Sequence, residues 1–522
     1  MRLDIDGRNC ELESGRSILD AVKKEGLDSI MLSDRPLAAQ IGGEVFNLRF
    51  TPKKDTQIHL LRYGEDMGRR VYERTLQFLF ILAMRKEFPR ARVCVRYSLG
   101  PGLFITVDGM EEPFNEEAAL KVETEMRRLV RLKLPLERRR ISIKEALSFY
   151  EQDGQADKAK LLKWRRFSYF DVYQIDGYMD YFYGEMAPDT SYADVFRVKY
   201  VHDGAVVLLM PRNDAPDVPS DYVDLPKLHA VFHQSDEWGK LMECATVNDL
   251  NTHIQNGTIR ELVRINEALH DRGYADIADK IVQKGAKAVL VAGPSSSGKT
   301  TSAHRISTQL RLQGCHPVML SLDDYYIDRD KIERDENGEI DLENINTLDI
   351  QRFGSDLAAL IRGEKVEVPR FDFTNGKRAP EGRILQLHDD EPVIIEGIHG
   401  LNPMLLSPEV DESKIFRVYV SALTTLNLDD HNRIRTTDIR ILRRLVRDYM
   451  TRNASMEHTL GMWASVRRGE EKGRFLYGGS TVVLLLQKDA AAPEPELLAA
   501  SQRGDEVAVC MGQRIGKALR RL

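Results

Sequence analysis

The chain has few cysteines, no long hydrophobic run and no large excess of charge of one sign. Its 5 cysteines are scattered over 522 residues and form no CxxC pair, which argues against a disulfide framework. No apolar run approaches the roughly 20 residues that cross a bilayer, and the N-terminus has no apolar centre like that of a signal peptide. A cytoplasmic protein with no membrane partner is therefore expected.

The formal net charge of −6 disfavours a general affinity for nucleic acid. One stretch departs from this balance, because residues 127–133 and 138–140 are rich in arginine. A solvated helix face with its exit loop is the favoured interpretation. An RNA- or partner-binding patch is the alternative.

Residues 293–301, Gly-Pro-Ser-Ser-Ser-Gly-Lys-Thr-Thr, have the spacing of a phosphate-binding P-loop. The glycines let successive N–H groups point into one concavity, which attracts a polyphosphate together with the N-terminus of the following helix. Lys299 would reach the outer phosphates, and the Thr300 hydroxyl would bind Mg²⁺. The predicted ATP-binding residues are Gly293, Pro294, Ser295, Ser296, Ser297, Gly298, Lys299, Thr300 and Thr301.

The surroundings of this motif support it. Residues 288–292 are an apolar run typical of a buried parallel strand. Residues 300–313 read as a helix, and Gly314 stands where a glycine stop belongs. Further apolar runs at 318–322, 393–395 and 416–420 predict an α/β domain over 286–478, with a parallel sheet and helices on both faces.

Acidic residues follow two of these predicted strands. Asp323 comes directly after the run 318–322, where a carboxylate can deprotonate a substrate hydroxyl and hold Mg²⁺ through water. Glu396 ends the strand 393–395 and is the second candidate carboxylate on the Mg²⁺ side. The alternatives are a helix cap, for which Asp324 is the better candidate, and a surface glutamate in a turn.

Arg443, Arg444 and Arg447 lie on one predicted helix between residues 437 and 452. Positions 444 and 447 are one turn apart and can point the same way, and the arginine fork suits phosphate oxygens. The alternative is an exposed charged helix that pairs with Asp438 and Asp448. His399 also follows a strand, where a lone histidine is more often structural.

These motifs resemble the phosphoribulokinase/uridine kinase family, in the order in which that family has them. The matching segments are 293–301, 323–326, 368–373, 396–397 and 443–448. The resemblance implies an ATP- and Mg²⁺-dependent nucleoside kinase. Its implied catalytic residues are Asp323, Lys299 and Arg447, its Mg²⁺-side groups are Thr300, Asp323 and Glu396, and its substrate-binding residues are Glu343, Phe371, Arg444 and Arg452.

The chain departs from that family at two positions near the acceptor. Gly376 stands in place of the histidine that reads the pyrimidine, and Ala454 in place of the second lid arginine. The kinase chemistry survives these changes, but the base specificity does not follow from the sequence. Another small hydroxyl compound, such as a sugar phosphate or a pantothenate-like alcohol, therefore stays open as the acceptor.

The N-terminal half resembles the front of threonyl-tRNA synthetases. Residues 1–62 are similar to the β-grasp TGS domain, with a predicted capping box at Ser17 and Asp20. Residues 63–215 resemble the α+β second additional domain, which carries an editing site in that family. The positions of its metal ligands hold Arg74, Phe78, Phe182 and Met186, which do not ligate a metal as His or Cys does.

The predicted organisation is therefore a P-loop kinase domain behind a TGS-like domain and a synthetase-like domain. A helical connector spans 216–285, and residues 479–522 form a tail without a functional interpretation. A homo-oligomer that acts on a nucleoside or another small hydroxyl substrate is expected. The alternative from a different class is a nucleotide-gated RNA- or ribosome-binding protein.

Overall fold

A computed structural model describes residues 2–332, 344–373, 375–388, 391–423, 425–452, 454–465, 491–493 and 516–518. The chain forms two compact units. The N-terminal unit contains residues 1–252, 425–434 and 469–522. The second unit contains residues 253–424 and 435–468 and is called the kinase unit below, after the resemblance described above. Among the described helices, none is both long and apolar enough to span a bilayer.

The N-terminal unit begins with a five-stranded sheet of order β2-β1-β5-β3-β4. The strands are β1 (Arg2–Ile5), β2 (Arg8–Glu11), β3 (Ala38–Ile41), β4 (Glu44–Phe46) and β5 (Thr56–Leu61). Helix α1 (Ile18–Lys24) buries Ile18, Leu19, Ala21 and Val22. The capping box predicted at its start is confirmed, because Ser17 and Asp20 satisfy each other's backbone N–H groups.

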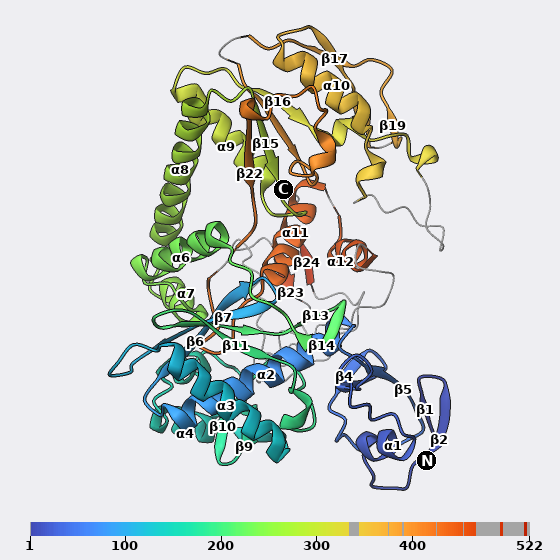
Figure 1. Ribbon diagram of the computed structural model, residues 1–522, viewed down its shortest axis with the longest axis vertical. Helices are drawn as coiled ribbons and strands as arrows, with labels where there is room; N and C mark the ends of the chain where they lie inside the picture. The colour runs from blue at the N-terminus through green and yellow to red at the C-terminus, as the bar shows by residue number, and fades with distance from the viewer. Residues whose placement is uncertain are drawn as a thin grey trace. The chain divides into compact units, whose positions relative to one another are not determined.

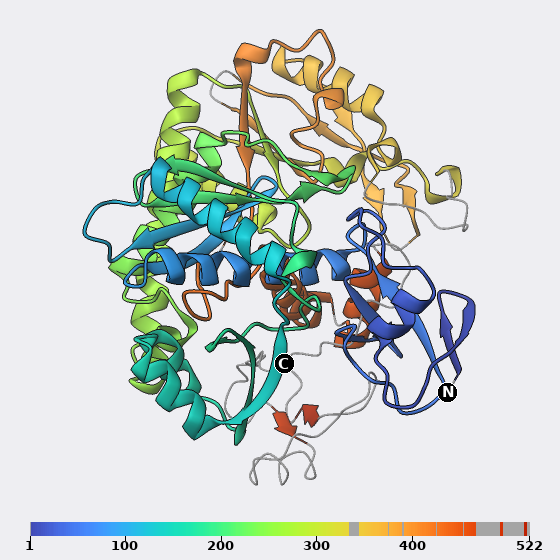
Figure 2. The same cartoon turned by 60° about the horizontal axis from the view of Figure 1, so that its bottom comes forward.

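A larger α+β body follows in the same unit. Helices α2 (Asp66–Glu87) and α3 (Glu116–Leu132) lie side by side, as Figures 1 and 2 show. Their apolar faces share one core with the four-stranded sheet β11-β12-β7-β6. Its strands are β6 (Arg92–Leu99), β7 (Gly102–Asp108), β11 (Arg197–His202) and β12 (Ala205–Leu209).

A second, smaller core lies beside this one. The three-stranded sheet β10-β9-β8 packs with α4 (Ile143–Gln152) and α5 (Ala156–Leu162). Its strands are β8 (Glu137–Ser142), β9 (Tyr169–Ile175) and β10 (Tyr178–Asp180). The unit is completed by β13 (Pro211–Arg212), β14 (Ala215–Pro219), α6 (Pro226–Leu241), most of α7 (Val247–Gln255) and the short pair β23 (Ala491–Pro493) and β24 (Gly516–Ala518).

The kinase unit is built on a four-stranded parallel sheet of order β16-β21-β15-β22. Its strands are β15 (Ala288–Ala292), β16 (Val318–Ser321), β21 (Val393–Gly397) and β22 (Ile415–Tyr419). Alternate residues of β15 enter different cores. Val289 and Val291 pack with α8 (Ile259–Lys284) and α9 (Lys299–Leu312), whereas Leu290 packs with α10 (Ile350–Ile361). This alternation places helices on both faces, so the predicted parallel sheet is confirmed.

Smaller elements extend the kinase unit. Two hairpins pair β17 (Val366–Val368) with β20 (Arg383–Leu385) and β18 (Phe371–Asp372) with β19 (Lys377–Arg378). Helices α11 (Thr436–Arg452) and α12 (Met456–Ser465) come last. The predicted connector 216–285 is divided, since α6 belongs to the N-terminal unit and α8 to the kinase unit.

Candidate active site at the phosphate loop

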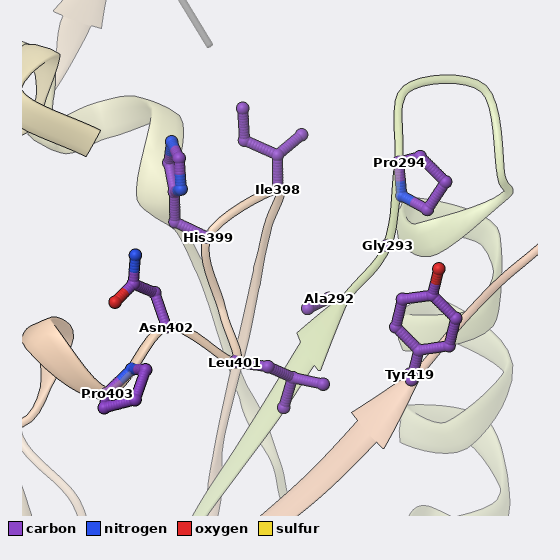
Figure 3. A pocket seen from close by; sticks show the side chains of 9 residues that line it. All are labelled: Ala292, Gly293, Pro294, Ile398, His399, Leu401, Asn402, Pro403 and Tyr419. Carbon is purple, nitrogen blue, oxygen red and sulfur yellow. The ribbon is translucent and has the colours of Figure 1, made fainter. Parts of the chain in front are cut away.

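The loop between β15 and α9 has the backbone that its glycines predict. Gly298 has φ +104° and Ser296 has φ +61°, so both lie in the left-handed region. A Cβ at Gly293 would lie 1.9 Å from the Val420 carbonyl oxygen, and only glycine fits there. Figure 3 shows Gly293 and Pro294 at the tip of β15, where the loop begins. The local sequence thus forces a tight turn at the carboxyl end of a buried strand.

The loop has buried polar groups whose hydrogen bonds are not satisfied. The hydroxyls of Ser296 and Ser297 are buried and have no hydrogen-bond partner among the described residues. Helix α9 begins at Lys299, and no side chain caps its N-terminus. Unsatisfied donors at a helix N-terminus fit a phosphate chain, because the helix dipole adds a partial positive charge. The loop therefore has the features of an anion-binding turn.

The predicted acidic residues lie at this loop. The Thr300 hydroxyl donates to Glu396 Oε2 at 3.2 Å, and the Ser321 hydroxyl donates to Glu396 Oε1 at 3.4 Å. Burial lowers the pKa of the Lys299 ammonium, and the nearby carboxylates of Glu396 and Asp323 oppose that shift. The structure thus brings Lys299, Thr300, Asp323 and Glu396 together.

Asp323 lies in the 3₁₀ turn η2 (Leu322–Tyr325), directly after β16. The cap of this turn is Ser321, whose hydroxyl accepts the Asp323 N–H at 3.2 Å. The prediction of Asp324 as the better cap is therefore wrong. Asp324 instead accepts the Phe371 N–H at 3.4 Å, and burial raises the pKa of Asp324 above its usual value.

Helix α11 brings two arginines to the loop, of which Arg443 was singled out from the sequence and Arg440 was not. The guanidinium of Arg440 donates to the Ser295 carbonyl at 2.9 Å. Arg443 donates to the Ser296 carbonyl at 3.1 Å. Arg440 was missed, although it lies on the same face as Arg443 and Arg444 at helical spacing.

Arg444 and Arg447, which the resemblance implies as substrate-binding and catalytic residues, make local ion pairs. Arg444 is buried and lies 3.4 Å from Asp448, and Arg447 lies 2.7 Å from the same carboxylate. Pairing with Asp448 was the alternative left open above, and it is present. Arg447 also lies close enough to Lys299 for its charge to act on that ammonium. Arg452 ends α11, and its side chain lies outside the described residues.

The structure describes some, but not all, of the residues predicted to bind the acceptor. Phe371 is buried, and its ring centroid lies 5.2 Å from that of Phe373 and 5.6 Å from that of Tyr326. Gly376 has φ +65°, and a Cβ there would lie 2.6 Å from the Arg329 side chain. A histidine at position 376 would thus be strained. Glu343 lies outside the described residues.

A pocket of about 590 Å³ opens beside the first residues of the loop. Figure 3 shows Ile398 and His399 on one side of it and Tyr419, at the end of β22, on the other. The lining residues are Ala292, Gly293, Pro294, Ile398, His399, Leu401, Asn402, Pro403 and Tyr419. Sequence reasoning missed most of them, because the loop after β21 carries no motif that marks a ligand site.

The positions at which the resemblance to threonyl-tRNA synthetases places metal ligands are filled by packing or backbone contacts. The rings of Phe78 and Phe182 meet edge to face at 5.7 Å, and Met186 is fully buried. Arg74 donates to the Glu185 carbonyl at 2.9 Å. In the part of the chain that is described, no three His, Cys, Asp or Glu side chains are grouped as metal ligands.

The basic stretch at 127–140 is largely neutralised by neighbouring carboxylates. Arg127 pairs with Glu123, and Arg128 pairs with Glu125 at 2.6 Å. Arg138 and Arg140 both contact Asp171, at 2.9 and 2.8 Å. This pattern is that of a solvated, ion-paired face.

Comparison with known proteins agrees with this geometry. The model of the phosphoribulokinase/uridine kinase family matches residues 288–472. The uridine kinase of Staphylococcus haemolyticus is 31% identical over 176 residues, which cover 34% of this chain and 75% of that enzyme. The chain belongs to the phosphoribulokinase/uridine kinase family. This membership places the kinase unit among phosphotransferases with an alcohol acceptor.

The N-terminal half is similar to threonine–tRNA ligases. The ligase of Clostridium kluyveri is 25% identical over 194 residues, which cover 37% of this chain and 30% of the ligase. The chain thus spans less than a third of that relative. The solved structure of a possible uridine kinase from Bacillus stearothermophilus shares 24% identity and covers 28% of this chain and 79% of that one, with a TM-score of 0.24.

A second family model, that of phosphatidylserine decarboxylase, matches residues 433–517. Most of this match lies outside the described residues.

Proposed function

We propose that this protein is an ATP- and Mg²⁺-dependent kinase that phosphorylates the 5′-hydroxyl of a uridine- or cytidine-like nucleoside. The proposal depends on one observation: the side chains of Lys299, Thr300, Asp323 and Glu396 lie near one another at a loop that glycines bend sharply. Phosphoryl transfer needs a phosphate cradle, oxygen groups for Mg²⁺, a carboxylate for the attacking hydroxyl and cations near the phosphate that is transferred. The chain has a candidate for each.

The phosphate loop would bind and orient the triphosphate. Its backbone N–H groups and the Ser296 and Ser297 hydroxyls face outer-phosphate oxygens in this proposal, and Lys299 neutralises their charge. Arg440 and Arg443 already lie at the loop and add positive charge there. Donors that are placed before the reaction need no reorganisation as charge develops.

The hydroxyl and carboxylate oxygens of Thr300 and Glu396 suit Mg²⁺, which prefers oxygen ligands and usually takes only one or two carboxylates beside substrate phosphates. Bound Mg²⁺ would bridge phosphate oxygens and offset their charge. Asp323, on the neighbouring strand end, would accept the proton of the acceptor hydroxyl.

The acceptor is proposed to lie at the carboxyl ends of the strands, as ligands do in open α/β sheets. The pocket beside Gly293 and the rings of Tyr326, Phe371 and Phe373 are the candidate surfaces. The Arg329 side chain packs against the Gly376 backbone. This contact favours a second candidate, a kinase for another small hydroxyl compound, because no side chain at position 376 reads a pyrimidine.

A phosphorylation assay with Mg-ATP and a panel of nucleosides, sugar phosphates and other alcohols tests both candidates. Product formation should fall by about 10³-fold in Asp323→Asn, which removes the general base. Asp411→Asn is the matched control, since Asp411 is an exposed aspartate of the same unit that caps the 3₁₀ turn η6 (Glu412–Lys414), where asparagine serves as well, and it should leave the rate nearly unchanged. Equal activity of Asp323→Asn and the wild type would remove Asp323 from its role, and transfer to no acceptor would overturn the proposal.

A further inference from the structure

The segment that begins at Asp323 runs along the hairpin of β18 and β19, and both belong to the kinase unit. Three hydrogen bonds of backbone N–H groups join them: Phe371 to the Asp324 carboxylate at 3.4 Å, Arg378 to the Asp328 carboxylate at 3.0 Å, and Arg329 to the Gly376 carbonyl at 2.9 Å. We call residues 323–331 and this hairpin the acceptor wall. The wall starts at the proposed general base and continues away from it.

One part of the acceptor wall is aromatic. The ring centroid of Phe371 lies 5.2 Å from that of Phe373 and 5.6 Å from that of Tyr326. Phe371 is buried, whereas Phe373 is 52% exposed. An exposed ring that rests on a buried aromatic support presents a flat apolar surface to solvent. The flat or apolar body of a small molecule can pack on this surface.

The side chain of Arg329 is held against the hairpin. A Cβ at Gly376 would lie 2.6 Å from Arg329 Cδ and 3.1 Å from Arg329 Nε, so the arginine occupies the space that a side chain at position 376 would need. The backbone hydrogen bond between the two residues supports the same contact. Glycine at position 376 thus makes room for the stem of Arg329, which carries the guanidinium along the acceptor wall.

Arg329 differs from the other cations of the acceptor wall in its partners. The others are paired with carboxylates: Lys331 with Asp328 at 2.8 Å, Lys377 with Asp330 at 3.2 Å, and Arg378 with Asp349 at 2.9 Å. Arg329 is exposed and forms no ion pair with any described residue. Its planar fork of N–H donors fits the oxygens of a carboxylate or a phosphate. The wall therefore has one cation whose charge no described carboxylate offsets.

Asp323 and Arg329 are close enough along the chain to meet two ends of one ligand. Six residues separate them, which sets an upper limit of about 20 Å for an extended chain. The actual path is shorter, because η2 and η3 (Arg329–Lys331) are 3₁₀ turns, which rise only about 2.0 Å per residue. Tyr326 of the aromatic surface lies halfway between the carboxylate and the cation in the sequence.

We infer that Arg329 is a specificity-determining residue of the acceptor site, and that the acceptor carries an oxyanion, a phosphate or a carboxylate, remote from the hydroxyl that is phosphorylated. The hydroxyl lies at Asp323, the body of the molecule packs on the aromatic rings, and the oxyanion meets the Arg329 guanidinium. This inference rests on the proposed kinase function. It applies to both candidate acceptors, a nucleoside or another small hydroxyl compound.

Acceptor pairs that differ by one oxyanion test the inference: uridine with uridine 3′-phosphate, ribose with ribose 5-phosphate, and panthenol with pantothenate. In at least one pair, the wild type should prefer the anionic member by about tenfold or more in kcat/KM. Arg329→Gln should raise the KM for that member by about 10- to 100-fold, as loss of a hydrogen bond to a charged group does. It should change kcat little. Arg329→Lys should restore part of the affinity, because it keeps the charge without the fork.

Lys331→Gln is the matched control. It also removes one positive charge, two residues away, but Lys331 is exposed and already paired with Asp328. The KM for the anionic member should therefore stay within about twofold of the wild-type value. Equal use of both members of every pair by the wild type would overturn the inference. An equal loss of activity with both members in Arg329→Gln would do the same.

Thermal unfolding without ATP separates this inference from the proposed function. The anionic member should raise the Tm of the wild type, and Arg329→Gln should lose most of that shift. Gly376→Ala should lose it as well, because its Cβ would displace the Arg329 side chain. If the wild type phosphorylates none of the six compounds, the proposed function fails, but the Tm shift still decides whether Arg329 binds an oxyanion. No shift in the wild type, or an equal shift in Arg329→Gln, would overturn the inference.

Discussion

The phosphate loop of the kinase unit and the aromatic cluster at Phe78 in the N-terminal unit differ in how their side chains are satisfied. The loop leaves the Ser296 and Ser297 hydroxyls buried without a partner among the described residues. At the cluster, the rings of Phe78 and Phe182 fill the space between them by packing. A buried donor without a partner costs free energy, so it persists where a ligand supplies the partner.

The phosphate loop thus leaves polar groups unsatisfied, whereas the cluster at Phe78 is closed by apolar packing. The kinase unit keeps strain and unpaired groups at its loop, as functional sites do. At Phe78 and Phe182 the N-terminal unit makes apolar contacts, which favour stability. Substitutions at the two places should therefore affect different measurements.

The largest effect, a loss of kcat, is expected at the phosphate loop. Lys299→Met should lower kcat by on the order of 10³-fold, because it removes the cation that faces the outer phosphates. The free energy of unfolding should change much less, since the hydrogen bond of Lys299 to the Pro294 carbonyl is long, at 3.5 Å. Steady-state kinetics and urea unfolding check the two statements. Lys365→Met, an exposed site in the same unit, is the control.

At the aromatic cluster around Phe78, we expect a large effect on stability instead of on kcat. Phe78 is fully buried, so Phe78→Ala should lower the free energy of unfolding by about 3 kcal/mol or more through lost transfer energy and a cavity. Leu120→Ala, at a side chain that is 66% exposed on α3, should cost little. Urea denaturation measures both. A fully stable Phe78→Ala protein would contradict the assignment of this position to packing.

A smaller effect on stability is expected at the start of the loop. A Cβ at Gly293 would lie 1.9 Å from the Val420 carbonyl oxygen, so Gly293→Ala must shift the loop or the end of β22. The expected cost is about 1–3 kcal/mol, and the thermal shift caused by Mg-ATP should shrink. Gly273→Ala on α8, where the Cβ meets nothing within 4 Å, should instead stabilise the helix slightly.

The smallest effect is expected at His59, which contacts Asp6 at 2.9 Å and Glu65 at 2.6 Å. Burial lowers the pKa of His59, but hydrogen bonds to Glu65 and Asp6 outweigh it and raise that pKa above its usual value. The charged form is thus favoured in the folded state, and its contribution is complete below about pH 6.5 and lost as pH rises through the folded pKa.

His59→Gln should therefore be less stable than the wild type by under about 1 kcal/mol in mild acid, since the group is about half exposed. The difference should vanish in alkaline solution. Thermal unfolding across pH checks this. A difference that grows with pH would show that the sign is wrong.

Most elements of the kinase unit could be predicted from local sequence signals. The strand, loop and helix at 288–313 were predictable because their signals are short-range: a buried apolar run, glycines at fixed spacing and a glycine stop. The acids Asp323 and Glu396 could also be found, since the carboxyl ends of parallel strands meet at one edge of the sheet. Arg440 could not, because nothing local distinguishes it from the other arginines of α11.

The sequence by itself determined that a phosphate loop follows a buried strand and that acidic residues end the neighbouring strands. Only the tertiary structure decided which arginines reach that loop and where residues 425–434 go. Residues 425–434 are mostly polar and contain no helix or strand. Their place depends on partners such as Lys158 and Asp180, which lie more than 240 residues away from His431 along the chain. Such long-range pairings come from folding as a whole and leave no periodic pattern in the sequence.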